Sequence, residues 1–218
     1  MIILAHRGCW RENSEKNTRA AFLRAFEAGY GIETDVRDLD GELVVSHDPA
    51  RRGAMRWGEL LDLYMEHGAP GQLAINIKAD GLAAGVTASL CDRDLASRSF
   101  VFDMSIPDMR SYLDGPVAVY TRFSDAEPTP AFYDQAQGVW VDDFTGAWAS
   151  SERALDDLSR GKGVALVSPE LHGKPHRDAW AAWDRDFRRA ADRQGFVNER
   201  LMVCTDRPDE AKQRFNGL

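Results

Sequence analysis

Short, continuous apolar runs recur along the chain, and a stretch with helical periodicity follows most of them. Strands that are buried on both faces carry uninterrupted apolar residues, whereas half-exposed strands alternate between apolar and polar positions. The runs therefore predict eight parallel strands, at residues 1–5, 31–36, 73–77, 100–104, 117–121, 138–141, 164–167 and 201–204.

The segments between these runs have the apolar spacing of amphipathic helices. Asn17 and Thr18 can cap one helix, and Gly29 is placed to end it. Trp180 and Trp183 stand at helical spacing further along the chain, which indicates core side chains rather than a carbohydrate platform. Strands that alternate with helices in this way, with a helix at the carboxyl end, are typical of an α/β fold.

We predict a (βα)8 TIM barrel formed by a single domain over residues 1–218. An open, doubly wound sheet is the alternative, because periodicity alone does not distinguish the two arrangements. Nothing in the pattern indicates an oligomeric state.

The charge balance excludes several functional classes. The 218 residues include 27 Lys and Arg against 35 Asp and Glu, so the net charge is −8. An acidic chain gains no counterion release on nucleic acid and is not drawn to anionic membranes, so we expect neither nucleic acid nor stable membrane association. The three cysteines form no metal-like spacing, and the amino terminus lacks the basic segment of a signal peptide. These features predict a cytoplasmic protein.

Polar side chains stand at the ends of the first predicted strands, where barrel enzymes carry their catalytic groups. Glu33 and Asp35 lie two residues apart in an otherwise apolar strand. Their side chains would point to the same face, about 6.6 Å apart along the strand, which suits two ligands of one hard cation such as Mg²⁺ or Ca²⁺. A buried pair of carboxylates without such a partner would be costly.

The segment after this strand predicts a β-hairpin. Asp40 and Gly41 form a strong two-residue turn signal, and ideal pairing sets Val36 opposite Val45. The hairpin would return His47 to the neighbourhood of the two carboxylates. Strict register would place His47 on the opposite face of the strand, so a twist or bulge is needed if all three act together.

The remaining polar residues suit the chemistry of a phosphodiester. His6 and His47 form a candidate pair for general acid and base catalysis, although the sequence does not say which is the acid. Arg7 and Lys78 could bind phosphate oxygens, because arginine does so bidentately and lysine acts as a point charge. Trp10 and Trp148 fall in loops where either could pack on a substrate.

At these residues the sequence resembles the glycerophosphodiester phosphodiesterase family, within the phospholipase-C-like phosphodiesterase barrels. The resemblance rests on short motifs over roughly the first 80 residues and on a Thr-Asp-x-Pro segment near the end: His6-Arg7-Gly8, Asn17-Thr18, Gly31-Ile32-Glu33-Thr34-Asp35-Val36, Asp40-Gly41, Val45-Ser46-His47-Asp48, Asn76-Ile77-Lys78 and Thr205-Asp206-Arg207-Pro208.

The resemblance implies a barrel with a small insertion after the second strand and a divalent cation, Mg²⁺ or Ca²⁺. His6 and His47 would then be general acid and base, and Arg7 and Lys78 would hold the phosphate. Glu33 and Asp35 would be metal ligands, together with the residue at position 76.

The chain departs from the family pattern at this third ligand. The family has a glutamate where this chain has Asn76, whose amide oxygen can ligate a hard cation but adds no negative charge. Asp103 or, in preference, Glu170 is predicted to compensate, and we also assign Glu170 to substrate binding. These features predict a divergent branch of the family.

Three functions remain open at this point. The first is hydrolysis of a small, soluble phosphodiester to an alcohol and a phosphomonoester. The second is a lyase that stops at a cyclic phosphate or acts on a phospholipid head group, the latter disfavoured because no basic amphipathic helix is present. The third is a phosphate-binding barrel without turnover, which only Asn76 supports.

Overall fold

In the computed structural model, which describes residues 1–145, 151–194 and 200–218, parallel strands alternate with helices as predicted. Each of the eight predicted runs forms a strand, and the predicted ends differ from the observed ones by at most three residues. They are β1 (Ile2–His6), β2 (Gly31–Leu39), β4 (Leu73–Ile77), β5 (Ser99–Phe102), β6 (Ala118–Phe123), β7 (Gly138–Val141), β8 (Gly163–Val167) and β9 (Leu201–Thr205).

The strand order confirms the (βα)8 barrel and excludes the open sheet. Neighbouring strands follow the order β1-β9-β8-β7-β6-β5-β4-β2, and β1 also pairs with β2, which closes the ring. A further strand, β3 (Glu42–Val45), pairs antiparallel with β2 at its outer edge. Its register sets Val36 opposite Val45 and Leu39 opposite Glu42, so the Asp40–Gly41 turn forms the predicted hairpin.

The described residues divide into two compact units. We call residues 4–119 the N-terminal unit, and residues 120–218 with residues 1–3 the C-terminal unit. The single domain over residues 1–218 stays a prediction.

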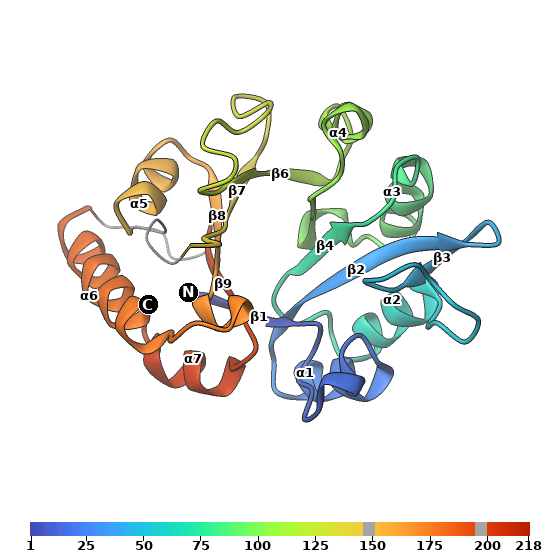
Figure 1. The fold of residues 1–218 in the computed structure, drawn as a ribbon, viewed down its shortest axis with the longest axis horizontal. Coiled ribbons are helices and arrows are strands. Elements are labelled where there is room, and N and C mark those ends of the chain that lie inside the picture. The colour runs from blue at the N-terminus through green and yellow to red at the C-terminus, as the bar shows by residue number, and fades with distance from the viewer. Residues whose placement is uncertain (146–150, 195–199) are drawn as a thin grey trace. The chain divides into compact units, whose positions relative to one another are not determined.

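Helices flank the strands of the N-terminal unit in Figure 1. They are α1 (Arg19–Glu27), α2 (Trp57–Glu66), α3 (Ala83–Cys91), α4 (Ile106–Leu113), and the short 3-10 helices η1 (Asn13–Glu15) and η2 (Ala96–Arg98). Those of the C-terminal unit are α5 (Ser151–Ser159), α6 (Arg177–Gln194), α7 (Pro208–Arg214) and the 3-10 helix η3 (Pro169–His172).

Helix α1 shows how local sequence sets an element of the N-terminal unit. The Thr18 hydroxyl accepts a hydrogen bond from the Ala21 backbone N–H and so satisfies a donor that the first turn leaves free. Phe22 and Phe26 are buried, and α1 packs on β2. Gly29 follows with a φ of 78°, the left-handed conformation that ends helices.

The C-terminal unit buries its aromatic residues as the helical spacing predicts. Trp180 and Trp183 of α6 are each 2% exposed, and the Trp180 indole N–H donates to the Ser168 hydroxyl at 2.7 Å. The Tyr120 ring lies against the two strand glycines Gly138 and Gly163, where any Cβ atom would overlap it. Among the described residues, no helix has both the length and the apolar character needed to cross a membrane.

Candidate active site

Strand register in the N-terminal unit brings the first predicted site residues together. In the parallel β1–β2 pair His6 is in register with Glu33, and in the β2–β4 pair Asp35 is in register with Asn76. Registered neighbours in a sheet present their side chains to the same face. The polar groups at the carboxyl ends of these three strands therefore share one face, as the sequence predicts.

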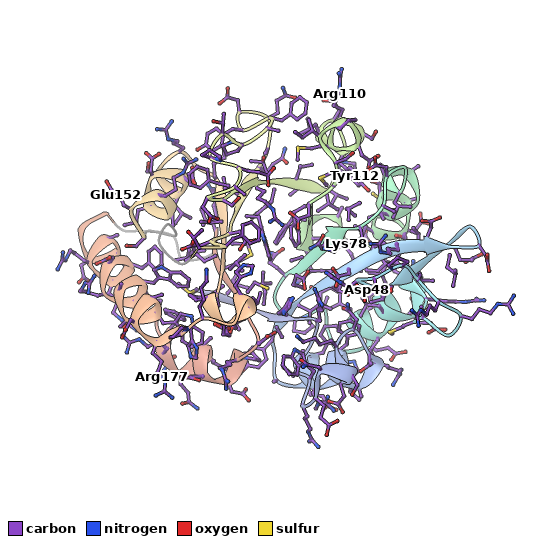
Figure 2. All side chains as sticks on the ribbon, viewed as in Figure 1. Asp48, Lys78, Arg110, Tyr112, Glu152 and Arg177 are labelled. Atoms are coloured by element: carbon purple, nitrogen blue, oxygen red, sulfur yellow. The ribbon has the colours of Figure 1, made fainter. Side chains whose placement is uncertain are left out.

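Asp35 is the most enclosed of these groups and is surrounded by donors. Its side chain is fully buried. Oδ2 accepts a hydrogen bond from the Asn17 amide at 2.8 Å and lies 3.1 Å from Arg7 Nε. Oδ1 lies 3.4 Å from Lys78 Nζ. Figure 2 labels Lys78, which directly follows β4. Two cations and an amide thus hold this carboxylate in place, and they compensate its charge.

Two of these donors sit on left-handed backbone. Arg7 and Asn17 have φ values of 58° and 60°; asparagine adopts this region more readily than other non-glycine residues, whereas arginine there is strained. Backbone hydrogen bonds fix both residues, from Arg7 N to the Glu33 carbonyl at 2.9 Å and from Asn17 N to the Arg7 carbonyl at 3.0 Å. Such strain persists where the surroundings enforce it, and it collects at functional sites.

Glu33 carries the most perturbed carboxyl group of the site. It is 2% exposed, and its Oε2 lies 3.8 Å from His6 Nε2. Burial, the largest cause, and the negative charges of Asp35 and Asp103 together raise the pKa of Glu33 from 4.5 to about 8, against the opposing effect of Arg7 and Lys78. Perturbed carboxyl groups of this kind mark candidate functional sites.

Three buried oxygens of the cluster have no hydrogen-bond partner within the part of the chain that the structure describes. They are Glu33 Oε2, Asp35 Oδ1 and Asn76 Oδ1. The Asn76 amide nitrogen donates to Asp103 Oδ2 at 3.2 Å, which turns the amide oxygen away from Asp103. Buried acceptors without donors are rare in proteins and call for an explanation such as a bound ion.

These oxygens fit a hard divalent cation. Carboxylate and amide oxygens are the ligands that Mg²⁺ and Ca²⁺ prefer. The described residues contain no group of three or more His, Cys, Asp or Glu side chains arranged for a metal. The third oxygen of this cluster belongs to the Asn76 amide. Asp103 accepts a hydrogen bond from the Asn76 amide. The Asp103 carboxylate therefore places a negative charge next to the amide, which carries none itself.

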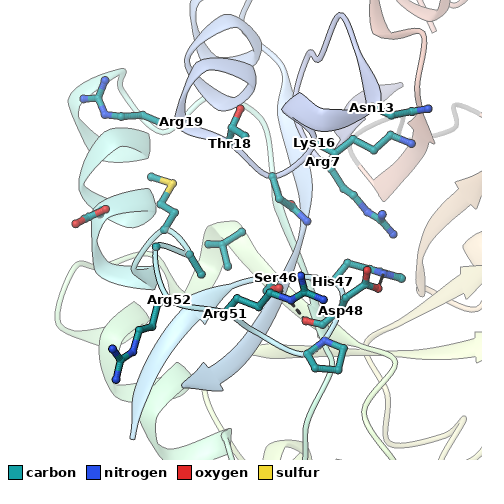
Figure 3. Close-up of a pocket in the computed structure, with 17 residues that line it drawn as sticks. Arg7, Asn13, Lys16, Thr18, Arg19, Ser46, His47, Asp48, Arg51 and Arg52 are labelled. Carbon is teal, nitrogen blue, oxygen red and sulfur yellow. Dashed lines mark hydrogen bonds and ion pairs between the residues drawn. The ribbon is translucent and has the colours of Figure 1, made fainter. Parts of the chain in front are cut away.

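His47 lies beyond the end of β3 in a cavity that borders this cluster. The Ser46 backbone N–H donates to the Asp35 carbonyl at 3.0 Å, and then the chain turns so that the His47 carbonyl accepts from Arg37 Nε at 3.0 Å. His47 Nδ1 pairs with Asp48 Oδ1 at 2.9 Å. The cavity is about 780 Å³, and Arg7 and Asn17 also line it (Figure 3). The hairpin thus places His47 in a cavity shared with two residues that contact Asp35.

Glu170 lies in the C-terminal unit, where three donors from that unit hold its carboxylate. Its oxygens accept hydrogen bonds from the hydroxyls of Ser168 and Thr205 and from the Asp206 backbone N–H. The predicted roles of Glu170 in substrate binding and in charge compensation stay predictions. Trp148 lies outside the described residues.

Sequence reasoning missed one contact of the site and, separately, one cluster of polar side chains in the C-terminal unit. The Asn17 side chain reaches Asp35, whereas the sequence suggested only a cap and a family motif; its neighbour Thr18 is the cap. In the C-terminal unit Asp142 lies 2.6 Å from His172 Nε2 and 3.1 Å from a terminal nitrogen of Arg122. Arg122 and Asp142 each directly follow a predicted strand, and this position marks them as candidate functional residues. No local sequence pattern indicates that His172 contacts Asp142.

Fold and site together define a (βα)8 barrel with a candidate cation and phosphate site at the ends of its first strands. No protein-family model matches the chain, and no curated protein matches its sequence. The structure resembles the glycerophosphodiester phosphodiesterase from Parabacteroides distasonis ATCC 8503, with a TM-score of 0.67 and 17% identity over 98% of this chain and 96% of that one. It also resembles the glycerophosphodiester phosphodiesterase from Agrobacterium tumefaciens str. C58, with a TM-score of 0.61 and 19% identity over 99% of each chain. At these identities the likeness shows a shared fold, so the functional argument depends on this chain's own residues.

Proposed function

We propose that the protein is a metal-dependent phosphodiester hydrolase that cleaves a small, soluble diester to an alcohol and a phosphomonoester. One observation carries the proposal: three buried acceptor oxygens without hydrogen bonds lie beside two cationic side chains and a histidine. A divalent metal ion fits the three oxygens, a phosphate group fits the cationic side chains of Arg7 and Lys78, and the histidine can transfer a proton.

Glu33, Asp35 and Asn76 would hold the divalent cation, Mg²⁺ or Ca²⁺, and Asp103 would orient the Asn76 amide. When bound there, the cation would neutralise charge on the phosphate and so favour attack on phosphorus. Arg7 and Lys78 keep about a fifth of their side-chain surface exposed, at 19% and 20%, so both can reach phosphate oxygens as well as Asp35.

We assign His6 and His47 to the two proton transfers. One histidine takes the proton of the attacking hydroxyl, from water or from a neighbouring substrate alcohol, as its oxygen bonds to phosphorus. The other donates a proton to the departing alcohol oxygen as the bond between that oxygen and phosphorus breaks. Attack by a substrate hydroxyl gives a cyclic phosphate first, and water opens that ring in a second step. An enzyme that lacks the second step is the lyase.

A reducing compartment suits the chain, because Cys9, Cys91 and Cys204, which all lie among the described residues, form no disulfide. We propose the cytoplasm as the site of action and a small molecule rather than a nucleic acid or membrane as the substrate. The net charge of −8 supports this choice.

Two substrates with different leaving groups test the proposal and the histidine roles together. Bis(p-nitrophenyl) phosphate releases a stable anion that needs no proton, whereas glycerophosphoglycerol releases an alcohol that does. With Mg²⁺, Ca²⁺ or Mn²⁺, we expect the wild type to cleave both. A His→Ala variant of the general acid should lose chiefly the second activity, and a variant of the general base should lose both.

Phosphorus NMR of the products separates the hydrolase from the lyase, because only the lyase accumulates a cyclic phosphate. Failure to cleave any diester with any of these cations would refute the proposed function. Binding of diester without turnover would instead support the phosphate-binding barrel.

A further inference from the structure

The cavity beside His47 is far more basic than the chain as a whole. Its volume of about 780 Å³ is that of a small-molecule site. Five of its lining side chains are cationic and two are anionic, although the chain carries a net charge of −8. The cationic residues are Arg7, Lys16, Arg19, Arg51 and Arg52, and the anionic ones are Asp48 and Glu59.

Local hydrogen bonds fix both walls of this cavity. One wall is the loop around η1, in which Glu15 accepts from the Arg11 backbone N–H and pairs with Arg24. The other wall follows β3, and there the Val45 N–H donates to the Met55 carbonyl at 2.8 Å. The cavity is therefore organised before any ligand binds, which lowers the entropic cost of binding.

Arg51 is the cation best placed to bind a ligand in this cavity. It begins a tight turn that is closed by a hydrogen bond from Ala54 N to the Arg51 carbonyl at 3.1 Å. Its side chain points toward Ser46 and His47, whereas the side chains of Arg19 and Arg52 point away (Figure 3). Within residues 1–145, 151–194 and 200–218 the Arg51 guanidinium has no ion-pair or hydrogen-bond partner.

Lys16 supplies a second cation from the opposite wall. Its ammonium group lies 4.4 Å from the centre of the Trp10 ring, a cation–π contact that limits the movement of a flexible side chain. Arg7, at the inner end, links the cavity to the candidate site through Asp35. Positive charge thus extends from the candidate phosphate position to Arg51.

We propose that the substrate carries a second oxyanion, a phosphomonoester or a carboxylate, on the group that occupies this cavity, and that Arg51 and Lys16 bind it. This inference rests on the proposed function and names its substrate class. A neutral or cationic group, such as glycerol or choline, would leave the Arg51 charge uncompensated, whereas an oxyanion pairs with it bidentately.

Three diesters with one scaffold test the inference: glycerophosphoglycerol, the same molecule with a terminal phosphate, and glycerophosphoglycerate. The measurement is kcat/KM with Mg²⁺ for the wild type, Arg51→Gln and Arg52→Gln. Arg52 is the matched control, since it is the next residue, lies on the same turn and loses the same charge. The wild type should prefer an anionic diester by roughly tenfold or more, the effect of one charge-assisted pair.

Arg51→Gln should remove most of this preference, and Arg52→Gln should keep it. A preference for only one of the two anionic diesters identifies which oxyanion the cavity binds. Cleavage of the neutral diester at an equal or higher kcat/KM would overturn the inference while the proposed function stands. An equal loss of the preference for anionic diesters in Arg51→Gln and Arg52→Gln would also overturn the inference, because the general positive charge of the surface would then explain that preference.

Calorimetry in EDTA, with the same diesters and without turnover, covers the case in which nothing is cleaved. Tighter binding of the phosphorylated diester that depends on Arg51 and not on Arg52 would support the oxyanion site even if the proposed function failed. Equal binding of the neutral and phosphorylated diesters would refute it.

Discussion

The buried carboxyl group of Glu33 gives the sharpest prediction about stability. Removing its capacity to ionise, in Glu33→Gln, should stabilise the protein when divalent cations are absent. Glu33 is 2% exposed, its Oε2 has no hydrogen-bond donor among the described residues, and Asp35 and Asp103 add negative charge nearby. Folding therefore forces this group to bind a proton that the unfolded chain does not hold at neutral pH.

The raised pKa sets the size of the effect. In the unfolded chain the carboxyl titrates near 4.5, and in the folded protein near 8. Between these values the folded state binds more protons, so this contribution to stability falls as the pH rises. Linkage gives a cost of about 1 kcal/mol at about pH 5 and about 3 kcal/mol at about pH 7. Glu33→Gln, which has no such cost, should gain these amounts.

Chemical denaturation in EDTA at the two pH values measures the gain. At neutral pH it corresponds to a rise of about 6–12 °C in Tm for a chain of this size. Glu152→Gln is the control, because Glu152 is exposed on α5 (Figure 2) and its substitution should stay within about 0.5 kcal/mol. If Glu33→Gln showed no gain at neutral pH, or the same gain at both pH values, the account of this carboxyl group would be refuted.

Three further predictions concern other parts of the molecule. Asp103→Asn should raise the Mg²⁺ concentration needed for half-maximal activity by roughly tenfold or more, because it loosens the Asn76 amide, and a metal titration measures this. Gly163→Ala should lower the unfolding free energy by about 1–3 kcal/mol, because its Cβ atom overlaps Tyr120, and Tyr120→Leu in the same chain should restore part of the loss. Asp157→Ala should cost about 3–5 kcal/mol by denaturant titration, because this fully buried carboxylate accepts hydrogen bonds from Arg153 Nε at 2.8 Å and from the Tyr133 hydroxyl at 2.6 Å, and both would be lost.

The barrel was predictable from sequence because its strands are buried on both faces. Uninterrupted apolar runs such as 164–167 and 201–204 leave a local signal that needs no knowledge of the fold. The hairpin was predictable for a similar reason, since the Asp40–Gly41 turn fixes the register of the strands on either side. Strand ends differ from the prediction where polar residues such as Arg37 and Asp38 continue β2 into the hairpin.

Only those features of the site that follow from strand order and register could be predicted from the sequence. Glu33, Asp35 and Asn76 stand at fixed positions on neighbouring strands, so their shared face follows from the pattern. The contact of Asn17 with Asp35 depends on a loop with left-handed backbone, and no periodicity encodes it. Likewise, a local hydrogen bond from Ala54 N to the Arg51 carbonyl closes the turn at Arg51, but no periodicity in the sequence indicates that the Arg51 side chain points toward His47.

The central claim is that a cation held by the β2 carboxylates is needed for diester cleavage. The most direct test measures glycerophosphodiester hydrolysis against free Mg²⁺ concentration for the wild type, Asp35→Asn and Asp38→Asn, with calorimetric Mg²⁺ binding on the same samples. Asp38 lies on the same strand and is exposed, so its variant controls for the loss of charge. We predict cleavage that EDTA abolishes, loss of both binding and cleavage in Asp35→Asn, and retention of both in Asp38→Asn. Cleavage that persists in EDTA, or that survives in Asp35→Asn with an unchanged Mg²⁺ dependence, would contradict the claim.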